Sequence, residues 1–161
     1  GVGQQRRFQE DERVPVDVAV VWAGGISTSY RGSFVSGRGG DPTGDTERTR
    51  ENHTISVSGT FRPPFGLAER LDRPLTTSAL AQYTSDRNCR ATAGGTACVA
   101  FLDELIRSLM VRLETTVSRT DLRLQLSYTD RKSFVGLRTG STQFQFGLFG
   151  RFIIADDALL R

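Results

Sequence analysis

Apolar and polar residues alternate along much of the chain, with the period of two that places β-strand side chains on opposite faces. The clearest case is residues 16–36. Its even positions from Val18 to Phe34 are mostly apolar or aromatic, and its odd positions are mostly small or polar. We interpret this stretch as one long strand with one apolar face. The pattern as a whole predicts an all-β chain.

Five further stretches alternate in the same way and complete a predicted antiparallel up-and-down meander of about six strands. Between the strands, polar stretches such as 37–51 and 130–141 predict long loops, and Ser118–Asp121 predicts a tight turn. Pro63 and Pro64 end the second strand, because proline cannot donate a ladder hydrogen bond. The predicted strands are 16–36, 52–62, 75–85, 108–118, 121–130 and 141–154.

One or two short helices are expected in the connections. Residues 65–72 place Leu67, Ala68 and Leu71 on one helical side. Residues 99–106 also contain leucine and isoleucine at helical spacing, and we interpret them as a helix that precedes the strand at 108. Alternation continues nearby, so the choice between helix and strand over 99–110 stays open.

The two cysteines suit a small disulfide loop. Cys89 and Cys98 flank a short segment that contains Gly94-Gly95, and such a close pair predicts a disulfide in an oxidising compartment. Two unrelated buried thiols are the alternative. The only histidine, His53, is far away in sequence, so no metal site is predicted, and no cofactor is expected.

Charge and candidate chemistry exclude several function classes. The net charge is +3 and the arginines are scattered, so nucleic acid is not an expected partner. His53 with Ser56 or Ser58 would suggest a hydrolase, as some outer-membrane barrels are, but nothing in the sequence supplies a third group to orient the pair. We therefore expect no enzymatic activity.

The aromatic residues favour a membrane-embedded barrel over a soluble sandwich. The longest apolar run, Val18–Ala23, is too short for a spanning helix, whereas barrel strands need only about 10 alternating residues. Tyr30, Tyr83 and Tyr128 each fall near the outer end of an outgoing strand. Barrels place aromatic rings at such levels, so we predict that these three tyrosines form an interface girdle.

The same reasoning assigns faces to the last strands. Phe144, Phe146, Leu148 and Phe152 are predicted to face lipid, whereas Arg123 and Arg151 are predicted to face the lumen. Six strands are too few to close a barrel in lipid. Because the chain begins at Gly1, we interpret residues 1–161 as a single C-terminal segment of a larger barrel, with upstream strands and outer-membrane lipid as its partners.

Two segments, Leu122–Phe134 and Gly140–Phe152, resemble the end of SprA-type proteins, the giant outer-membrane barrels of the type IX secretion system. The connection Arg62–Leu75 is similar in style, and the resemblance spans roughly residues 14–155. It implies a translocon pore at the bacterial cell surface, with secreted proteins and secretion-system subunits as partners. It also implies a periplasmic C-terminus.

Two other interpretations remain at this point. The phenylalanine-rich face suits the interior of a soluble β-barrel or sandwich that binds a small apolar ligand. An outer-membrane hydrolase is the third possibility. Neither has a diagnostic motif in the sequence.

Overall fold

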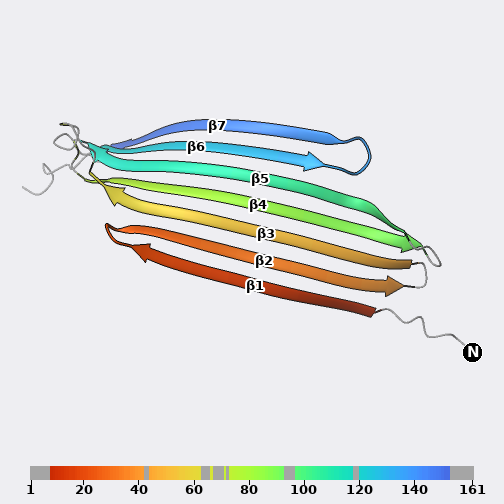
Figure 1. The fold of residues 1–161 in the computed structure, drawn as a ribbon. Coiled ribbons are helices and arrows are strands. Elements are labelled where there is room, and N and C mark those ends of the chain that lie inside the picture. Colours follow the sequence, from red (N-terminus) through yellow and green to blue (C-terminus); the bar gives the residue numbers. More distant parts are fainter. Residues whose placement is uncertain are drawn as a thin grey trace, which may run out of the picture.

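The computed structural model describes residues 8–41, 44–62, 66, 71, 73–92, 97–117 and 120–152. These residues form one sheet of antiparallel strands whose order in space follows their order in sequence (Figure 1). The predicted all-β up-and-down meander is thereby confirmed, with seven strands in place of about six. The strands are β1 (Phe8–Trp22), β2 (Ile26–Asp41), β3 (Gly44–Phe61), β4 (Leu75–Thr92), β5 (Cys98–Val117), β6 (Thr120–Ser133) and β7 (Thr139–Phe152).

The single long strand predicted over 16–36 is wrong, because the chain reverses in the middle of it. Gly24 and Gly25, with φ angles of 85° and 79°, form the turn between β1 and β2. Glycine adopts this left-handed conformation without the steric cost of a Cβ. Trp22 pairs with Ile26 across the turn, so even positions stay on the same face and the alternation is not interrupted.

The long polar loops predicted over 37–51 and 130–141 are largely wrong. β2 continues to Asp41, β3 begins at Gly44, and β6 continues to Ser133. Ladder hydrogen bonds join backbone groups whatever the side chains are, so a strand can continue where both of its faces are polar. The alternation of apolar and polar residues therefore reveals only those parts of a strand that have one apolar face.

The helix predicted near 99–106 is also wrong, since this stretch belongs to β5. The register between β4 and β5 shifts at Asn88 and Cys89, which is a β-bulge. The other predicted helix, 65–72, lies mostly outside the described residues. In the part of the chain that the structure describes, no helix is long and apolar enough to cross a membrane.

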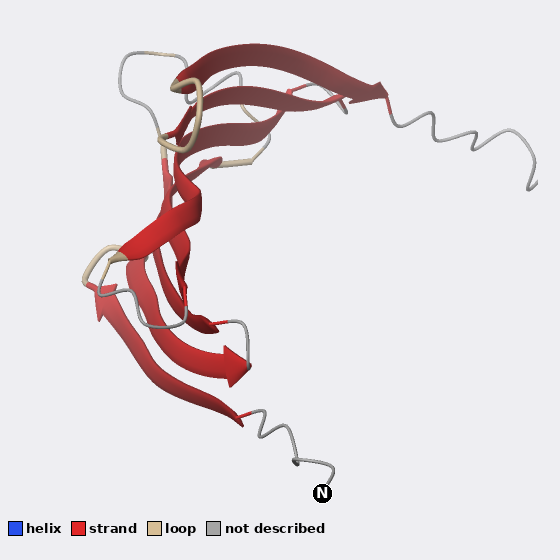
Figure 2. Cartoon of the chain, turned by 90° about the vertical axis from the view of Figure 1, so that its right-hand side faces the viewer, coloured by secondary structure: helices blue, strands red, loops and turns tan. Residues whose placement is uncertain are grey.

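The sheet has almost no core. Among the described residues, Cys89 is the one apolar side chain that is buried, joined by the polar Asp86 and Thr116. Figure 2 shows an open, twisted surface whose two edges stay apart. β1 and β7 form these edges and do not pair with each other. Among the described residues, no second sheet covers either face.

Candidate functional site

Strand pairing sorts the side chains into two contrasting faces. Residues that pair across antiparallel strands lie on the same face, and alternate residues of each strand lie on the opposite one. We call the apolar face the one that carries a row running through all seven strands: Val18, Tyr30, Ile55, Ala81, Leu109, Tyr128 and Phe144. The opposite side is the polar face.

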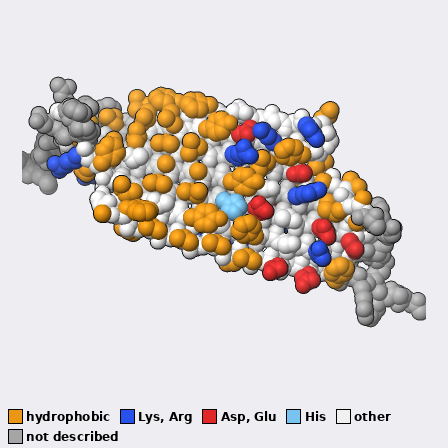
Figure 3. Space-filling model, in the orientation of Figure 1, with side chains coloured by type: hydrophobic (Ala, Val, Ile, Leu, Met, Phe, Trp, Pro, Cys, Tyr) orange, Lys and Arg blue, Asp and Glu red, His pale blue; other side chains and the backbone are white. Residues whose placement is uncertain are grey.

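The apolar face carries a continuous band of apolar side chains that ends at a charged border. On β1 the band reaches from Val14 to Trp22, roughly 26 Å at about 3.3 Å per residue. Figure 3 shows this face, with apolar side chains over most of it and charged side chains gathered toward the right-hand end. We call that end, where Asp41 and Gly44 meet, the charged end. The opposite end, at the turn between Trp22 and Ile26, is the apolar end.

The border of the band is displaced along the strands from one edge of the sheet to the other. Val14 pairs with Phe34 at the border on β1 and β2, but the same row reaches Lys132 and Gly140 on β6 and β7. On β7 the band begins at Phe144, further toward the apolar end. A stagger of this kind is what strand tilt produces in a barrel wall.

The structure places Phe144, Phe146 and Leu148 together on the apolar face, where they are 69%, 63% and 67% exposed. The backbone of Phe152 continues the same alternation, but its side chain lies outside the described residues. Arg123 and Arg151 lie on the polar face. Phe144, Phe146 and Leu148 thus share one face of the sheet, and Arg123 and Arg151 share the other.

Tyr83 and Tyr128 lie at the charged border, whereas Tyr30 pairs with Val18 in the middle of the band, so the predicted girdle of three tyrosines does not lie along one border. Tyr30 and Tyr128 belong to one row, and Tyr83 lies one row nearer the charged end. His53, which the sequence analysis considered only as a catalytic or metal-binding residue, lies beside Tyr30 and Tyr83. The hydroxyl of Tyr30 is 2.8 Å from Nδ1 of His53, and the ring of His53 lies 5.1 Å from that of Phe34 and 5.7 Å from that of Tyr83.

Trp22 and Phe61 mark the apolar end of the band. Both are exposed, and the indole Nε1 of Trp22 donates a hydrogen bond to Oγ1 of Thr28 at 3.0 Å. The sequence interpretation missed Trp22 because it placed this residue in the middle of one long strand. The pair Gly24-Gly25 was the signal that could have placed Trp22 at a strand end.

His53 is not paired with the serines once considered as its partners. It lies on the apolar face, whereas Ser56 and Ser58 lie on the polar face. There, the hydroxyl of Ser56 is 2.7 Å from that of Ser29, and the hydroxyl of Ser58 is 2.8 Å from that of Ser27. The Ser–His arrangement that would suggest a hydrolase is not formed by these residues.

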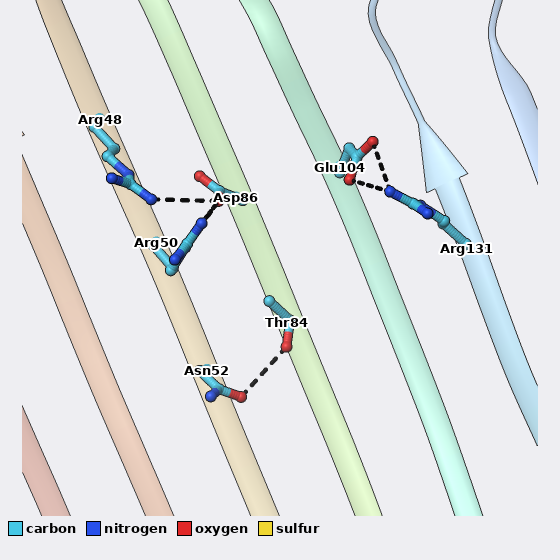
Figure 4. Close-up of polar contacts among 7 residues, drawn as sticks. All are labelled: Arg48, Arg50, Asn52, Thr84, Asp86, Glu104 and Arg131. Atoms are coloured by element: carbon cyan, nitrogen blue, oxygen red, sulfur yellow. Dashed lines mark hydrogen bonds and ion pairs between the residues drawn. The ribbon is translucent and has the colours of Figure 1, made fainter.

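Ion pairs between neighbouring strands characterise the polar face. Figure 4 shows Arg48 and Arg50 of β3 converging on Asp86 of β4. Nε of Arg50 donates to Oδ2 of Asp86 at 2.8 Å, and Arg48 lies 3.8 Å from the same oxygen. Further along, Arg131 donates to both carboxylate oxygens of Glu104, at 2.9 and 3.2 Å.

A second carboxylate on this face is also shared by two arginines. Oε1 of Glu114 lies 2.6 Å from Nε of Arg123 and 4.0 Å from Nε of Arg112. Arg112 also donates to Oε1 of Gln125 at 3.5 Å. Arg123, which the sequence placed on the polar face, thus belongs to a three-residue cluster built from β5 and β6.

The polar face is not uniformly polar. Leu80, Ile106 and Met110 lie on it, near the middle of β4 and β5. Phe149 also lies there, with its ring over Gly147, because a Cβ added at Gly147 would come within 2.7 Å of a ring carbon of Phe149. A larger residue at 147 would displace that ring.

Cys89 and Cys98 connect β4 and β5 near the charged end. Their sulfur atoms are 2.02 Å apart, the distance of a disulfide bond, and their Cα atoms are 5.4 Å apart. Glu47 lies within 4.8 Å of the sulfurs. Sulfur atoms bonded to each other are not the thiolates that metal ions prefer, so this group is a cross-link.

Comparison with protein-family models, with curated proteins and with solved structures finds no match to this chain.

Proposed function

We propose that this chain forms part of the wall of a β-barrel in the bacterial outer membrane. In this proposal the apolar face contacts lipid and the polar face lines a water-filled lumen. The observation that carries it is the continuous apolar band, bordered by Tyr83, Tyr128 and His53, on a sheet whose other face holds ion pairs.

The energetics of the apolar face support a lipid environment. Burying a large apolar side chain is worth roughly 1.5–3 kcal/mol relative to leaving it in water. The apolar face exposes such side chains on six of the seven strands, all except β4, among them Val18, Ile55 and Phe146. The described strands all belong to one sheet, so no second sheet of this part of the chain covers them.

The dimensions of the band support the same proposal. Outer-membrane barrels carry an apolar belt about 25 Å tall, spanned by strands of about 9–11 residues and flanked by aromatic residues. The stretch from Val14 to Trp22 has the required length, with Trp22 at one end. The ion-paired polar face suits a wet lumen, which accepts charge.

The finer part of the proposal is a protein-secretion pore of the SprA type, with a periplasmic C-terminus. The resemblance of Leu122–Phe134 and Gly140–Phe152 supports it. The direction of β7 supports the orientation, because this strand runs from the charged end toward the apolar end. Upstream strands, secretion-system subunits and secreted proteins would be the partners.

Cysteine labelling of β7 tests the proposed wall. In the full-length protein reconstituted into lipid vesicles, single cysteines replace Gln145 and Arg151 on the polar face, or Phe146 and Leu148 on the apolar face. A membrane-impermeant maleimide should label the cysteines at 145 and 151 and leave those at 146 and 148 unlabelled. Labelling of all four after denaturation is the control for thiol integrity.

The reverse labelling pattern would overturn the proposal. A full-length protein that remains soluble and never enters the vesicles would also overturn it, and would favour a soluble protein with an apolar binding surface.

A further inference from the structure

We propose that the polar face binds anionic groups, carboxylates or phosphates, and that two pairs of arginines supply the positive charge. Arg48 and Arg50 flank Asp86 in the first pair. Arg112 and Arg123 flank Glu114 in the second pair. This inference rests on the proposed barrel, because it requires that the polar face line water.

Each arginine pair has one more positive charge than its carboxylate can neutralise. A guanidinium group stays protonated at any physiological pH, so the surplus of about one charge per pair is permanent. The other ion pairs on this face, Arg131 with Glu104 and Arg31 with Asp17, match one cation with one anion. Of these four clusters, the two arginine pairs are therefore the ones whose charges are unbalanced.

In the first pair, the guanidinium groups of Arg48 and Arg50 are more exposed to water than the carboxylate of Asp86. The side chains of Arg48 and Arg50 are 47% and 45% exposed, whereas that of Asp86 is only 11% exposed. The carboxylate is thus covered while the guanidinium groups remain accessible. Each guanidinium carries five N–H donors, so donors are left for a second anion.

Arg123 of the second pair, with the Glu114 that it contacts, lines a hollow of about 560 Å³ at the apolar end of the sheet. Three arginines line this hollow, Arg73, Arg123 and Arg151, together with two carboxylates, Glu114 and Asp121. The planar guanidinium group matches the oxygen pairs of carboxylates and phosphates, so such a hollow suits either kind of anionic group.

A single reporter cysteine measures the local potential. Ser127 lies on the polar face of β6 between Arg123 and Arg131, and it pairs with Met110, two residues from Arg112. In the reconstituted full-length protein at low salt, the Ser127→Cys variant is treated with a sulfonate-bearing or a trimethylammonium-bearing methanethiosulfonate. Normalised to a small thiol in solution, the anionic reagent should react faster than the cationic one.

Neutralising the second pair should remove this preference. We expect Arg112→Gln with Arg123→Gln to lower the anion-to-cation rate ratio at residue 127 by about fivefold, the size expected for two unit charges within roughly 10 Å of the thiol. The matched control is Arg131→Gln with Glu104→Gln, which removes a balanced ion pair and should leave the ratio unchanged.

Competing anions identify the group that is bound. Phosphate and acetate are added at matched ionic strength. Stronger slowing of the anionic reagent by phosphate assigns the site to phosphate groups, and equal slowing assigns it to carboxylates as well. No slowing by either would overturn the binding of anionic groups.

The outcomes separate this inference from the barrel itself. If the cysteine at 127 reacts equally with both reagents, or if the arginine variants leave the ratio unchanged, the anion preference is wrong and the barrel stands. If the cysteine at 127 reacts with neither reagent, the polar face is closed to solutes and the inference is overturned. If a cysteine at Leu148 reacts while one at Ser127 does not, the barrel proposal fails.

Discussion

At the scale of single residues, neighbours on one strand differ sharply in what surrounds them. Leu148 is exposed on the apolar face near the middle of the band, whereas Gln145, on the same strand, lies on the polar face. The hydroxyl of Ser127 donates to Gln145 at 3.4 Å. A charge introduced at Leu148 should therefore destabilise the protein much more than a charge introduced at Gln145.

We expect Leu148→Arg to lower the free energy of unfolding by roughly 2–4 kcal/mol, the penalty for a cation at the bilayer midplane of an outer-membrane barrel. The matched variant Gln145→Arg should change it by less than about 1 kcal/mol, because the polar face already accommodates arginines. Denaturant unfolding of the full-length protein in lipid vesicles measures both values. Equal destabilisation by the two variants would contradict the assignment of faces.

Gly147 is unsuitable as the control in that comparison. The ring of Phe149 occupies the space that a side chain at 147 would need. Any substitution there mixes the effect of charge with that of displacing an aromatic ring. The close approach of a ring to a glycine was not visible in the sequence, which gave only the alternation of Gly147 with Phe146 and Leu148.

At the scale of whole strands, the sequence predicted β-structure wherever one face is apolar and the other polar. β6 and β7 were found close to their true positions for this reason. The sequence interpretation missed the turn between β1 and β2, because the pairing of Trp22 with Ile26 keeps even-numbered residues on one face through the turn. The hidden signal was the turn chemistry of Gly24-Gly25, which alternation alone does not weigh.

β5 misled the prediction because both of its faces carry large apolar side chains. Leu102 and Ile106 lie on the polar face, while Leu105 and Leu109 lie on the apolar face. Two sets of residues, each with a spacing of four, combine to imitate the apolar stripe of a helix. Each arginine cluster of the polar face joins residues from two neighbouring strands. The sequence alone did not reveal these clusters, because the pairing register decides which residues lie side by side.

The cross-link between β4 and β5 gives a prediction at this scale. Trypsin cleaves after Arg87, Arg90 and Arg107, which separates Cys89 from Cys98. Without reduction, mass spectrometry of the exported full-length protein should find peptide 88–90 joined to peptide 91–107, and reduction should release the two. Free alkylated thiols in both peptides before reduction would contradict the cross-link.

At the scale of the whole sheet, the apolar band crosses the strands obliquely. The row that carries Val14 and Phe34 at one edge carries Lys132 and Gly140 at the other. A band that lies level in a membrane must therefore hold its strands at an angle to the membrane normal. The oblique band therefore predicts that the strands are tilted relative to the membrane normal.

We expect the strands of the full-length protein to tilt by roughly 35–45° from the membrane normal, as in other transmembrane barrels. Polarised infrared spectroscopy of oriented bilayers measures the mean tilt from the dichroism of the amide bands. Strands lying flat on the bilayer would contradict a spanning wall, and would indicate that the sheet adsorbs through its apolar face.

The open edges of the sheet have a consequence for how any barrel around it can close. Successive strands alternate in direction, so β1 and β7 both run from the charged end toward the apolar end. Joining them directly would create a parallel seam in an otherwise antiparallel wall. The barrel closes with antiparallel pairing throughout only if an odd number of strands is added to these seven. The total is then even, as in bacterial barrels.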